Sequence, residues 1–190
     1  MRIGLLGGSF DPPHTGHLLA AGDAFEALSL DRLVFIPAAV QPLKVQQDAA
    51  APEHRLAMVR LLIGDDPRFD VDAMEIDRGG LSYTVDTLSA YAAESASAEL
   101  FWLVGADVVR SFARWREPKR ISELATVVVL QRTDEAPDLA SIPGTPRCLA
   151  TRRIDISSTE VRDRVRKGKS IRGFVPDAVA AYIAAQRLYR

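Results

Sequence analysis

Short apolar runs alternate along the chain with stretches that carry apolar side chains at helical spacing. The apolar runs are short and rich in branched residues, which is typical of buried strands. They predict strands at residues 3–6, 33–36, 69–73, 100–104 and 126–130. The amphipathic stretches predict helices at residues 14–28, 52–63, 84–96 and 175–188, and a further helix that starts at Ser157. The stretch from Asp134 to Pro146 is interpreted as a loop because it is rich in proline.

This repeated order of strand and helix predicts an α/β fold with a doubly wound, mostly parallel sheet and helices on both faces. In such folds, ligands bind beyond the carboxyl ends of the strands, where the strand order reverses. We therefore expect the site in the loops that follow Leu6, Ile36 and Val104. Residues 1–190 are expected to form one domain, with the helices from about residue 157 packed on it.

Composition narrows the class of function. The chain has 190 residues, of which 47% are hydrophobic and 26% are charged, and its formal net charge is -1. These values are typical of a soluble globular protein and argue against a nucleic-acid partner held by bulk charge. The one cysteine, Cys148, cannot form an intrachain disulfide and argues against a thiolate metal site. No apolar run approaches the ~20 residues of a membrane span and none at the start resembles a signal peptide, so we expect a cytoplasmic protein without a membrane partner.

The first expected strand leads into a turn that opens a helix, with the sequence Gly7-Gly8-Ser9-Phe10-Asp11-Pro12-Pro13-His14-Thr15-Gly16-His17. Glycines let backbone N–H groups approach a ligand, and a helix start presents unpaired N–H donors that suit phosphate. His14 and His17 share one face of the first turn, and Gly16 between them leaves room for a phosphate. A turn with two surface histidines is the alternative, but two of the 3 histidines of the chain lie in this turn. The segment is neither a Walker motif nor a dinucleotide-binding G-x-G-x-x-G.

A second candidate anion site is the segment Ile156-Ser157-Ser158-Thr159-Glu160-Val161-Arg162. Ser157 and Glu160 have the spacing of a capping box, which predicts a helix start and by itself explains Ser157. The additional hydroxyl groups and Arg162 go beyond a cap, because a guanidinium one turn into the helix can reach phosphate oxygens near its N-terminus. The basic residues that follow are interpreted as a solvated face that raises the local positive potential.

The first turn resembles the T/H-x-G-H signature of the nucleotidyltransferase superfamily, and the second segment resembles its I-S-S-T-x-x-R motif at every fixed position. Similarity to the bacterial nicotinate-nucleotide adenylyltransferases extends over nearly the whole chain. The resemblance implies a Rossmann-like nucleotidyltransferase fold. It also implies an enzyme of NAD biosynthesis that transfers AMP from ATP to nicotinate mononucleotide, giving nicotinate adenine dinucleotide (deamido-NAD) and pyrophosphate.

The resemblance also assigns roles to residues. It implies catalytic roles for His14, His17, Lys44 and Arg162. It implies contacts with ATP for Gly7, Gly8, Ser9, Phe10, Gly16, Gly105, Asp107, Ile156, Ser157, Ser158 and Thr159. Mg²⁺ is expected to bridge the phosphates of ATP and to keep several waters, so no metal-binding motif of the protein itself is expected.

Several segments point to the acceptor. The loop from Pro37 to Lys44 is similar to the family's P-x-x-x-x-P-x-K loop, although Leu43 replaces a frequent His and Gln41 a common Pro. The acceptor-binding residues implied by the resemblance are Arg55, Ser82, Tyr83, Thr84 and Trp115. The helix start at Tyr83 and Thr84 would receive the nicotinate carboxylate, and Trp115 would offer a flat face and a backbone N–H to the pyridine ring. A surface charge, an ordinary capped helix and a core tryptophan are the respective alternatives, and the ending Arg187-Leu188-Tyr189-Arg190 is expected to be structural packing.

Other functions remain open at this point. An adenylyltransferase for nicotinamide mononucleotide or pantetheine phosphate is the nearest, although the pantetheine-phosphate family lacks the S-Y-T-x-D-T segment. A non-catalytic nucleotide sensor is disfavoured by the intact His14, His17 and Arg162. A synthetase-like tRNA module is disfavoured because the chain contains no K-M-S-K-S sequence. The sequence leaves open both the nicotinate preference and the formation of a homo-oligomer.

Overall fold

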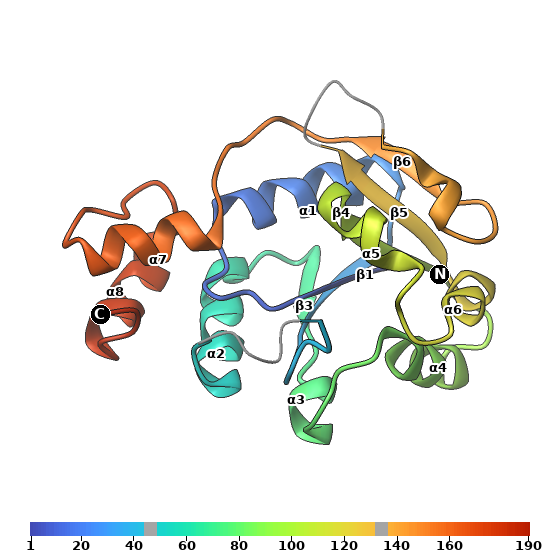
Figure 1. The fold of residues 1–190 in the computed structure, drawn as a ribbon, viewed down its shortest axis with the longest axis horizontal. Coiled ribbons are helices and arrows are strands. Elements are labelled where there is room, and N and C mark those ends of the chain that lie inside the picture. Colours follow the sequence, from blue (N-terminus) through green and yellow to red (C-terminus); the bar gives the residue numbers. More distant parts are fainter. Residues whose placement is uncertain (44–48, 132–136) are drawn as a thin grey trace.

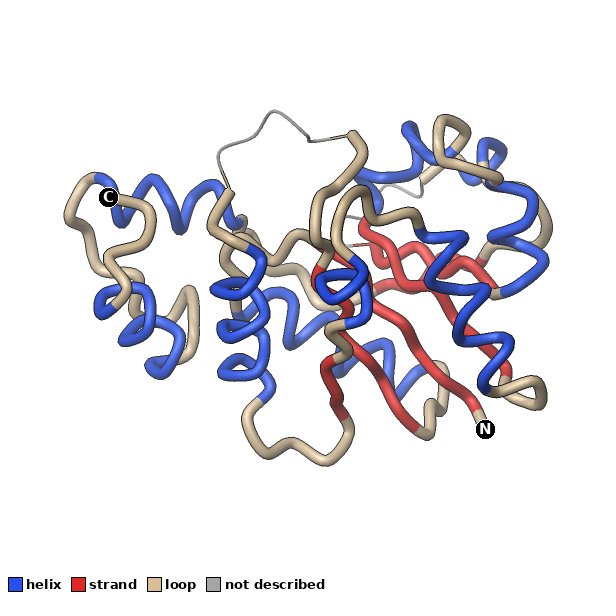
Figure 2. The backbone as a smooth tube through the Cα atoms, turned by 90° about the horizontal axis from the view of Figure 1, so that it is seen from below, coloured by secondary structure: helices blue, strands red, loops and turns tan. Residues whose placement is uncertain are grey.

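The computed structural model describes residues 1–43, 49–131 and 137–190. Its described part contains a six-stranded sheet in the order β3-β2-β1-β4-β5-β6, and every neighbouring pair is parallel. The strands are β1 (Arg2–Gly8), β2 (Arg32–Pro37), β3 (Phe69–Val71), β4 (Glu99–Gly105), β5 (Thr126–Gln131) and β6 (Arg147–Ala150). Figure 2 shows them side by side in the interior, with helices around them. The predicted doubly wound parallel sheet is confirmed.

The helices fall on both faces of this sheet. They are α1 (Thr15–Ala27), α2 (Pro52–Ile63), α3 (Met74–Arg78), α4 (Thr84–Glu94), α5 (Val109–Phe112), α6 (Pro118–Leu124), α7 (Ser158–Arg166) and α8 (Asp177–Ala185). Two short 3₁₀ helices, η1 (Ala106–Val108) and η2 (Leu139–Ser141), complete the set in the described residues. In Figure 1, α7 and α8 lie together at the left end of the molecule, and α4 and α6 lie at the opposite side.

Alternating side chains of the strands form two separate cores. Leu6, Leu103 and Leu130 point to the face covered by α1, α2, α7 and α8. Their neighbours Leu5 and Val104 point to the other face, which α4, α5 and α6 cover. This alternation follows from the two-residue period of a strand, and burial on both faces explains why the strands are almost wholly apolar.

Four elements were not predicted from the sequence. The edge strand β6 has mostly exposed side chains, so no hydrophobic pattern marks it. The helices α3, α5 and α6 have 5, 4 and 7 residues, which is too short for a clear helical period. The predicted loop at 134–146 begins in residues outside the described ranges, and its described part is irregular apart from η2.

The ends of the predicted elements needed small corrections. The last helix stops at Ala185 instead of Leu188, because Arg187 adopts a left-handed conformation with φ 54.

None of the helices in the described residues is long and apolar enough to cross a bilayer.

Candidate active site

A cleft of about 760 Å³ opens at the carboxyl ends of the central strands. The strand order reverses between β1 and β4, and the loops that leave these two strands both line the cleft. This is the position where doubly wound sheets bind ligands. The sequence-predicted residues in its lining are Gly7, Gly8, Ser9, Phe10, His14, His17, Arg55, Gly105, Asp107, Ile156, Ser157, Ser158, Thr159 and Arg162. We call this cavity the main cleft.

The two histidines of the first turn lie against each other at the start of α1. His14 is the N-cap residue and is 2% exposed. Its backbone N–H donates to Nδ1 of His17 at 3.1 Å, and the ring centroids of the two imidazoles are 3.8 Å apart. The ring of Phe10 meets the His17 ring edge-on at 5.2 Å. The pair is therefore a built part of the cleft wall and not a pair of surface histidines.

The backbone hydrogen bond also assigns the tautomer of His17. Because Nδ1 accepts from the His14 N–H, it carries no proton in that arrangement. The proton of the neutral ring is then on Nε2, the atom that would donate to a phosphate oxygen.

The glycines of the turn make room for side chains of the protein itself. A Cβ on Gly16 would lie 3.0 Å from Nδ1 and 3.1 Å from Cε1 of His14. A Cβ on Gly8 would lie 3.0 Å from the Phe10 ring, and one on Gly7 would lie 2.6 Å from the Trp102 indole. The sequence analysis interpreted Gly16 as space for phosphate, and the structure adds that Gly16 is needed to seat the His14 imidazole.

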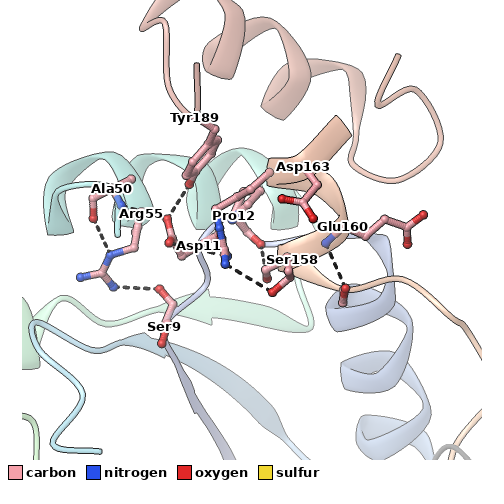
Figure 3. Close-up of polar contacts among 12 residues, drawn as sticks. Ser9, Asp11, Pro12, Ala50, Arg55, Ser158, Glu160, Asp163 and Tyr189 are labelled. Carbon is pink, nitrogen blue, oxygen red and sulfur yellow. Dashed lines mark hydrogen bonds and ion pairs between the residues drawn. The ribbon is translucent and has the colours of Figure 1, made fainter. Parts of the chain in front are cut away.

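The start of α7 docks directly on this first turn. Ser157 is the N-cap of α7 and accepts from the Glu160 N–H at 3.1 Å, as the capping spacing predicted. The Ser158 hydroxyl donates to the Pro12 carbonyl at 2.8 Å (Figure 3). Arg162 donates from Nη1 to the Asp11 carbonyl at 2.7 Å. The residues that the Ser158 and Arg162 contacts join are more than 140 positions apart in the sequence. The first turn and the start of α7 thus form one wall of the main cleft.

Arg162 is only partly satisfied by the protein. Its Nη2 donates to the Thr159 hydroxyl at 3.3 Å, and its buried Nε has no hydrogen-bond partner among the residues that the structure describes. Its side chain is 19% exposed and lines the cleft. A buried guanidinium donor without a partner favours an anion in this position.

Arg55 is a buried bracket between two loops. It is 3% exposed and donates to the carbonyls of Ser9, Ala38, Ala39 and Ala50 at 2.6–3.0 Å. Burial lowers the pKa of its guanidinium, and the neighbouring Asp11 acts in the opposite direction. The alternative of a surface helix charge is therefore wrong. These carbonyl groups use four of the five N–H donors of Arg55. Binding of the acceptor substrate by Arg55 stays a prediction, and it depends on the fifth N–H.

The predicted acceptor residues of α4 lie beside the main cleft and not in its lining. Val40 lines the cleft and forms a bridge with Leu81, and Ser82 follows directly. The Ser82 hydroxyl accepts from the Ala39 N–H at 2.9 Å, so it ties the loop after β2 to the start of α4. Tyr83 is the N-cap of α4, and Thr84 is the first helical residue. Lys44 lies outside the described residues.

Trp115 differs in one respect from its predicted role. It is half-buried and stacks on Phe112, with ring centroids 4.9 Å apart and planes at 27°. Its backbone N–H donates to the Phe112 carbonyl at 3.0 Å. The expectation that this N–H serves a pyridine ring is corrected, because the turn that carries Trp115 already uses it. The second face of the indole is what Trp115 can offer a ligand.

The end of β4 places an exposed carboxylate at the cleft. Asp107 lies in η1, the short helix that begins directly after Gly105, and Gly105 and Asp107 both line the cleft. A Cβ on Gly105 would lie 2.5 Å from Oδ1 of Asp107. The carboxylate thus lies close over the Gly105 backbone, and a larger residue at position 105 would displace it. Carboxylate oxygens of this kind can accept hydrogen bonds from ribose hydroxyl groups.

Three polar side chains with a structural role were not predicted from the sequence: Asp11 and Glu75, which are buried, and Tyr189, which is half-buried. Asp11, 6% exposed, accepts from the Tyr189 hydroxyl at 2.7 Å and links the first turn to the far end of the chain (Figure 3). Glu75, 4% exposed, accepts from the Thr87 hydroxyl at 2.5 Å beneath α4. Asp11 stands inside a quoted motif, which was an available signal, whereas nothing near Glu75 or Tyr189 in the sequence marks a partner.

Comparison with known proteins identifies the family. The family model described as Cytidylyltransferase-like matches residues 5–164. A protein of Gemmatimonas aurantiaca named "Probable nicotinate-nucleotide adenylyltransferase" is 53% identical over 198 residues, covering 100% of this chain and 93% of that protein. A Thermus thermophilus protein of the same name is 47% identical over 190 residues, and the alignment covers 100% of both chains.

Solved structures agree on the fold. Plasmodium falciparum nicotinic acid mononucleotide adenylyltransferase complexed with NaAD has a TM-score of 0.82 at 18% identity, covering 99% of this chain and 97% of that one. The matched family model spans both anion-binding motifs, and the relatives named above match over the full length of the chain. The chain therefore belongs to the cytidylyltransferase-like family and, within it, to the nicotinate-nucleotide adenylyltransferases.

Proposed function

We propose that this protein transfers the adenylyl group of ATP to nicotinate mononucleotide and releases pyrophosphate. The observation that carries the proposal is the convergence of two helix starts, with His14 and His17 from one and Arg162 from the other, on the main cleft. Helix starts and guanidinium groups suit a polyphosphate. The names of the relatives and the dinucleotide complex of the structural neighbour support the choice of acceptor.

The arrangement suits direct transfer between two bound substrates. An oxygen of the acceptor's 5′-phosphate attacks the α-phosphorus of ATP in line, the new P–O bond forms, and the bond to pyrophosphate breaks. The attacking oxygen is already ionised, so no general base and no covalent enzyme intermediate is needed. Alignment of the two substrates can lower the barrier by roughly 7–11 kcal/mol. His17 through Nε2–H, Arg162 and Lys44 would stabilise the charge that develops on the phosphates.

The donor set of the cleft fits a magnesium ion carried by ATP. Among the described residues, the cleft is lined by two carboxylates, Asp11 and Asp107, and the structure contains no cluster of three or more metal-binding side chains. Asp11 is already bonded to Tyr189 and Ala50. Mg²⁺ would thus be held by phosphate oxygens and water, with Asp107 the remaining carboxylate of the lining, and would neutralise phosphate charge when bound.

The start of α4 is the proposed subsite for the nicotinate carboxylate. The first turn of a helix presents N–H groups without intrahelical partners, and this end is electropositive. Asp86 in that first turn opposes an anion, and Arg116 offsets it, since its Nη1 lies 3.5 Å from the Asp86 carboxylate and its guanidinium lies over the Tyr83 ring. This pairing supports nicotinate over the neutral nicotinamide.

One assay tests the acceptor. The protein is incubated with ATP and Mg²⁺ and, in turn, nicotinate mononucleotide, nicotinamide mononucleotide and pantetheine phosphate, and pyrophosphate release is measured. We expect the highest kcat/KM with nicotinate mononucleotide. Release with none of the three would contradict the proposed activity and favour a nucleotide sensor, and a preference for pantetheine phosphate would move the chain to another acceptor class.

The cytoplasmic location stays a prediction from the sequence, and the sequence leaves homo-oligomer formation open. A cytoplasmic location is tested by fractionation of cells that express the protein. Homo-oligomer formation is tested by light scattering of the purified protein.

A further inference from the structure

A buried carboxylate, Asp11, connects the first turn to a segment almost at the other end of the sequence. Its Oδ1 accepts two hydrogen bonds, from the Tyr189 hydroxyl at 2.7 Å and from the Ala50 N–H at 3.0 Å. Figure 3 shows Tyr189 reaching down to Asp11 from the C-terminal segment, with Arg55 on one side and the start of α7 on the other. The Asp11 carboxylate is thus held by two segments that are distant from it in sequence.

Arg162 lies next to this carboxylate but does not pair closely with it. Its Nη1 donates to the backbone carbonyl of Asp11 at 2.7 Å, while the distance from Nη1 to Oδ2 of Asp11 is 3.8 Å. Buried arginine and carboxylate groups normally form shorter, charge-assisted hydrogen bonds. The two donors on Oδ1 hold the carboxylate in an orientation in which this short contact is not made.

The orientation matters because Arg162 is a proposed phosphate ligand. A guanidinium that is bonded to the backbone carbonyl still offers donors to the main cleft, among them the Nε, which has no partner in the described ranges 1–43, 49–131 and 137–190. If the Arg162 guanidinium paired with the Asp11 carboxylate, it would offer fewer N–H donors to ATP. The positive potential at the ATP phosphates would also be weaker. The carboxylate is therefore a competitor of the polyphosphate for Arg162.

We propose that Tyr189 is a positioning residue which, by hydrogen-bonding the Asp11 carboxylate, keeps Arg162 available for the phosphates of ATP. The proposal rests on the adenylyl-transfer function proposed above. It assigns to the C-terminal segment a part in the active site, whereas the sequence analysis expected structural packing.

The surroundings of Tyr189 suit this task. Leu188 and Tyr189 pack against the core cluster of the α1 face, and the Leu188 N–H donates to the Ile183 carbonyl at 3.1 Å. Tyr189 itself has φ 62, in the left-handed region that side chains rarely adopt. Burial, and then the hydrogen bond to Asp11, raise the pKa of the phenol. The hydroxyl therefore keeps its proton and remains a donor at neutral pH.

The test compares two tyrosines of the same C-terminal unit. Tyr189→Phe removes the hydroxyl that holds Asp11. Tyr182→Phe is the matched control, because the Tyr182 hydroxyl lies 2.9 Å from Nδ1 of His54 on α2 and, within the described residues, is not a hydrogen-bond partner of Asp11. We expect Tyr189→Phe to raise KM for ATP by about tenfold and to leave KM for nicotinate mononucleotide within about twofold. We expect Tyr182→Phe to keep wild-type kinetics, with a similar shift of the unfolding midpoint in both variants.

A double-mutant cycle separates positioning from general damage. In an Asp11→Asn background the side chain is neutral and no longer attracts Arg162, so Tyr189→Phe should then change KM for ATP by less than about twofold. Wild-type KM for ATP in Tyr189→Phe would overturn the inference. A tenfold effect that persisted in the Asp11→Asn background would overturn it as well.

Direct titration keeps the inference separate from the proposed activity. ATP binding to the wild type and to Tyr189→Phe is measured by calorimetry without any acceptor. If the wild type formed no dinucleotide, the proposed function would fail, and weaker ATP binding by Tyr189→Phe than by Tyr182→Phe would still support the role of Tyr189. Equal ATP binding by the two variants would refute it.

Discussion

The hydrogen bonds of single side chains decide which atoms of the main cleft can serve a ligand. The His17 Nδ1 is used by the backbone of His14, which puts the ring proton on Nε2. Arg55 donates most of its N–H groups to four carbonyl groups and so positions loops, whereas the buried Nε of Arg162 has no protein partner among the residues that the structure describes. Two arginines in one cleft thus have different tasks, because their local partners differ.

His17→Ala should lower turnover by at least about 100-fold, because it removes a donor to the charge that develops in the transition state. The fold should survive, since the lost bond to the His14 N–H is worth about 1 kcal/mol. His54→Ala is the control, because His54 lies on α2 and its ring contacts Tyr182 outside the cleft lining. Turnover of His17→Ala within a few-fold of the wild type would remove His17 from the mechanism.

Asp107→Ala should mainly weaken nucleotide binding. The exposed carboxylate lines the cleft and has no part in either core cluster, so its loss should leave stability unchanged within about 0.5 kcal/mol. Loss of hydrogen bonds to ribose hydroxyl groups should raise KM for ATP by about tenfold. Steady-state kinetics with each substrate varied in turn measures this, and unchanged KM values for both would contradict the assignment.

Helix α1 shows how one element combines fold and chemistry. Its N-terminal turn carries the two histidines, and its middle buries Ala20, Ala21 and Ala24 against the sheet. The small residues of the buried face let the helix approach the strands closely, which brings the first turn to the carboxyl end of β1. The two glycines of α1 have different surroundings, so they separate these two tasks experimentally.

Gly16→Ala should lower kcat by about tenfold or more without unfolding the protein. The added Cβ would lie 3.0 Å from Nδ1 of the His14 imidazole and displace it, and small misplacements in a reacting site are costly. Gly22→Ala in the same helix is the control, because the nearest atom to its Cβ, Arg68 Nη1, is 3.9 Å away. This control should keep wild-type turnover and gain up to about 1 kcal/mol of stability in urea unfolding. Equal turnover of both variants would show that the His14 position does not matter.

The whole molecule brings distant parts of the chain to one edge of the sheet. The parallel order puts the carboxyl ends of β1, β2 and β4 side by side, and α7 returns to the first turn from beyond β6. On the opposite face, Glu75, Thr87 and Ser82 form a buried polar cluster that holds α3 and α4 together and reaches the loop after β2. This cluster makes the stability of the whole molecule depend on pH.

Glu75→Gln should stabilise the protein at neutral pH. Burial raises the pKa of the Glu75 carboxyl, against the opposing effect of hydrogen bonds from Thr87 and Ser82. Because the pKa is higher in the folded than in the unfolded protein, folding favours the neutral carboxyl. The protein therefore loses stability as the pH rises from the ordinary pKa of glutamate through the raised pKa. The gain of Glu75→Gln should therefore be larger at neutral pH than at acidic pH and should shrink as the pH falls toward about 4.3, the ordinary pKa of glutamate.

Urea unfolding at several pH values measures this difference. Glu94→Gln is the control, because Glu94 is exposed at the end of α4 and its substitution should show no such trend. A gain that stayed constant down to acidic pH would point to packing instead of charge.

Part of the candidate site could be read from the sequence because it is local. The helix start at Ser157 and the turn from Gly7 to His17 depend on neighbouring residues, and both were predicted in place. The burial of Arg55 was missed, because it depends on carbonyl groups that only the folded loops supply. The occupied N–H of Trp115 is a local contact with Phe112, and it was missed because no sequence pattern marked the short helix α5 that ends there. Short elements such as α3 and β6 were missed because they show no hydrophobic period.

The sequence by itself determined the alternating strands and helices, the helix starts at the first turn and at Ser157, and the family, because periodicity and motifs are properties of neighbouring residues. Only the tertiary structure decided that these helix starts share one cleft and that Tyr189 holds Asp11 beside Arg162. Contacts across 150 or more residues depend on how the strands are ordered and how the cores pack, and no local pattern encodes a partner at that distance.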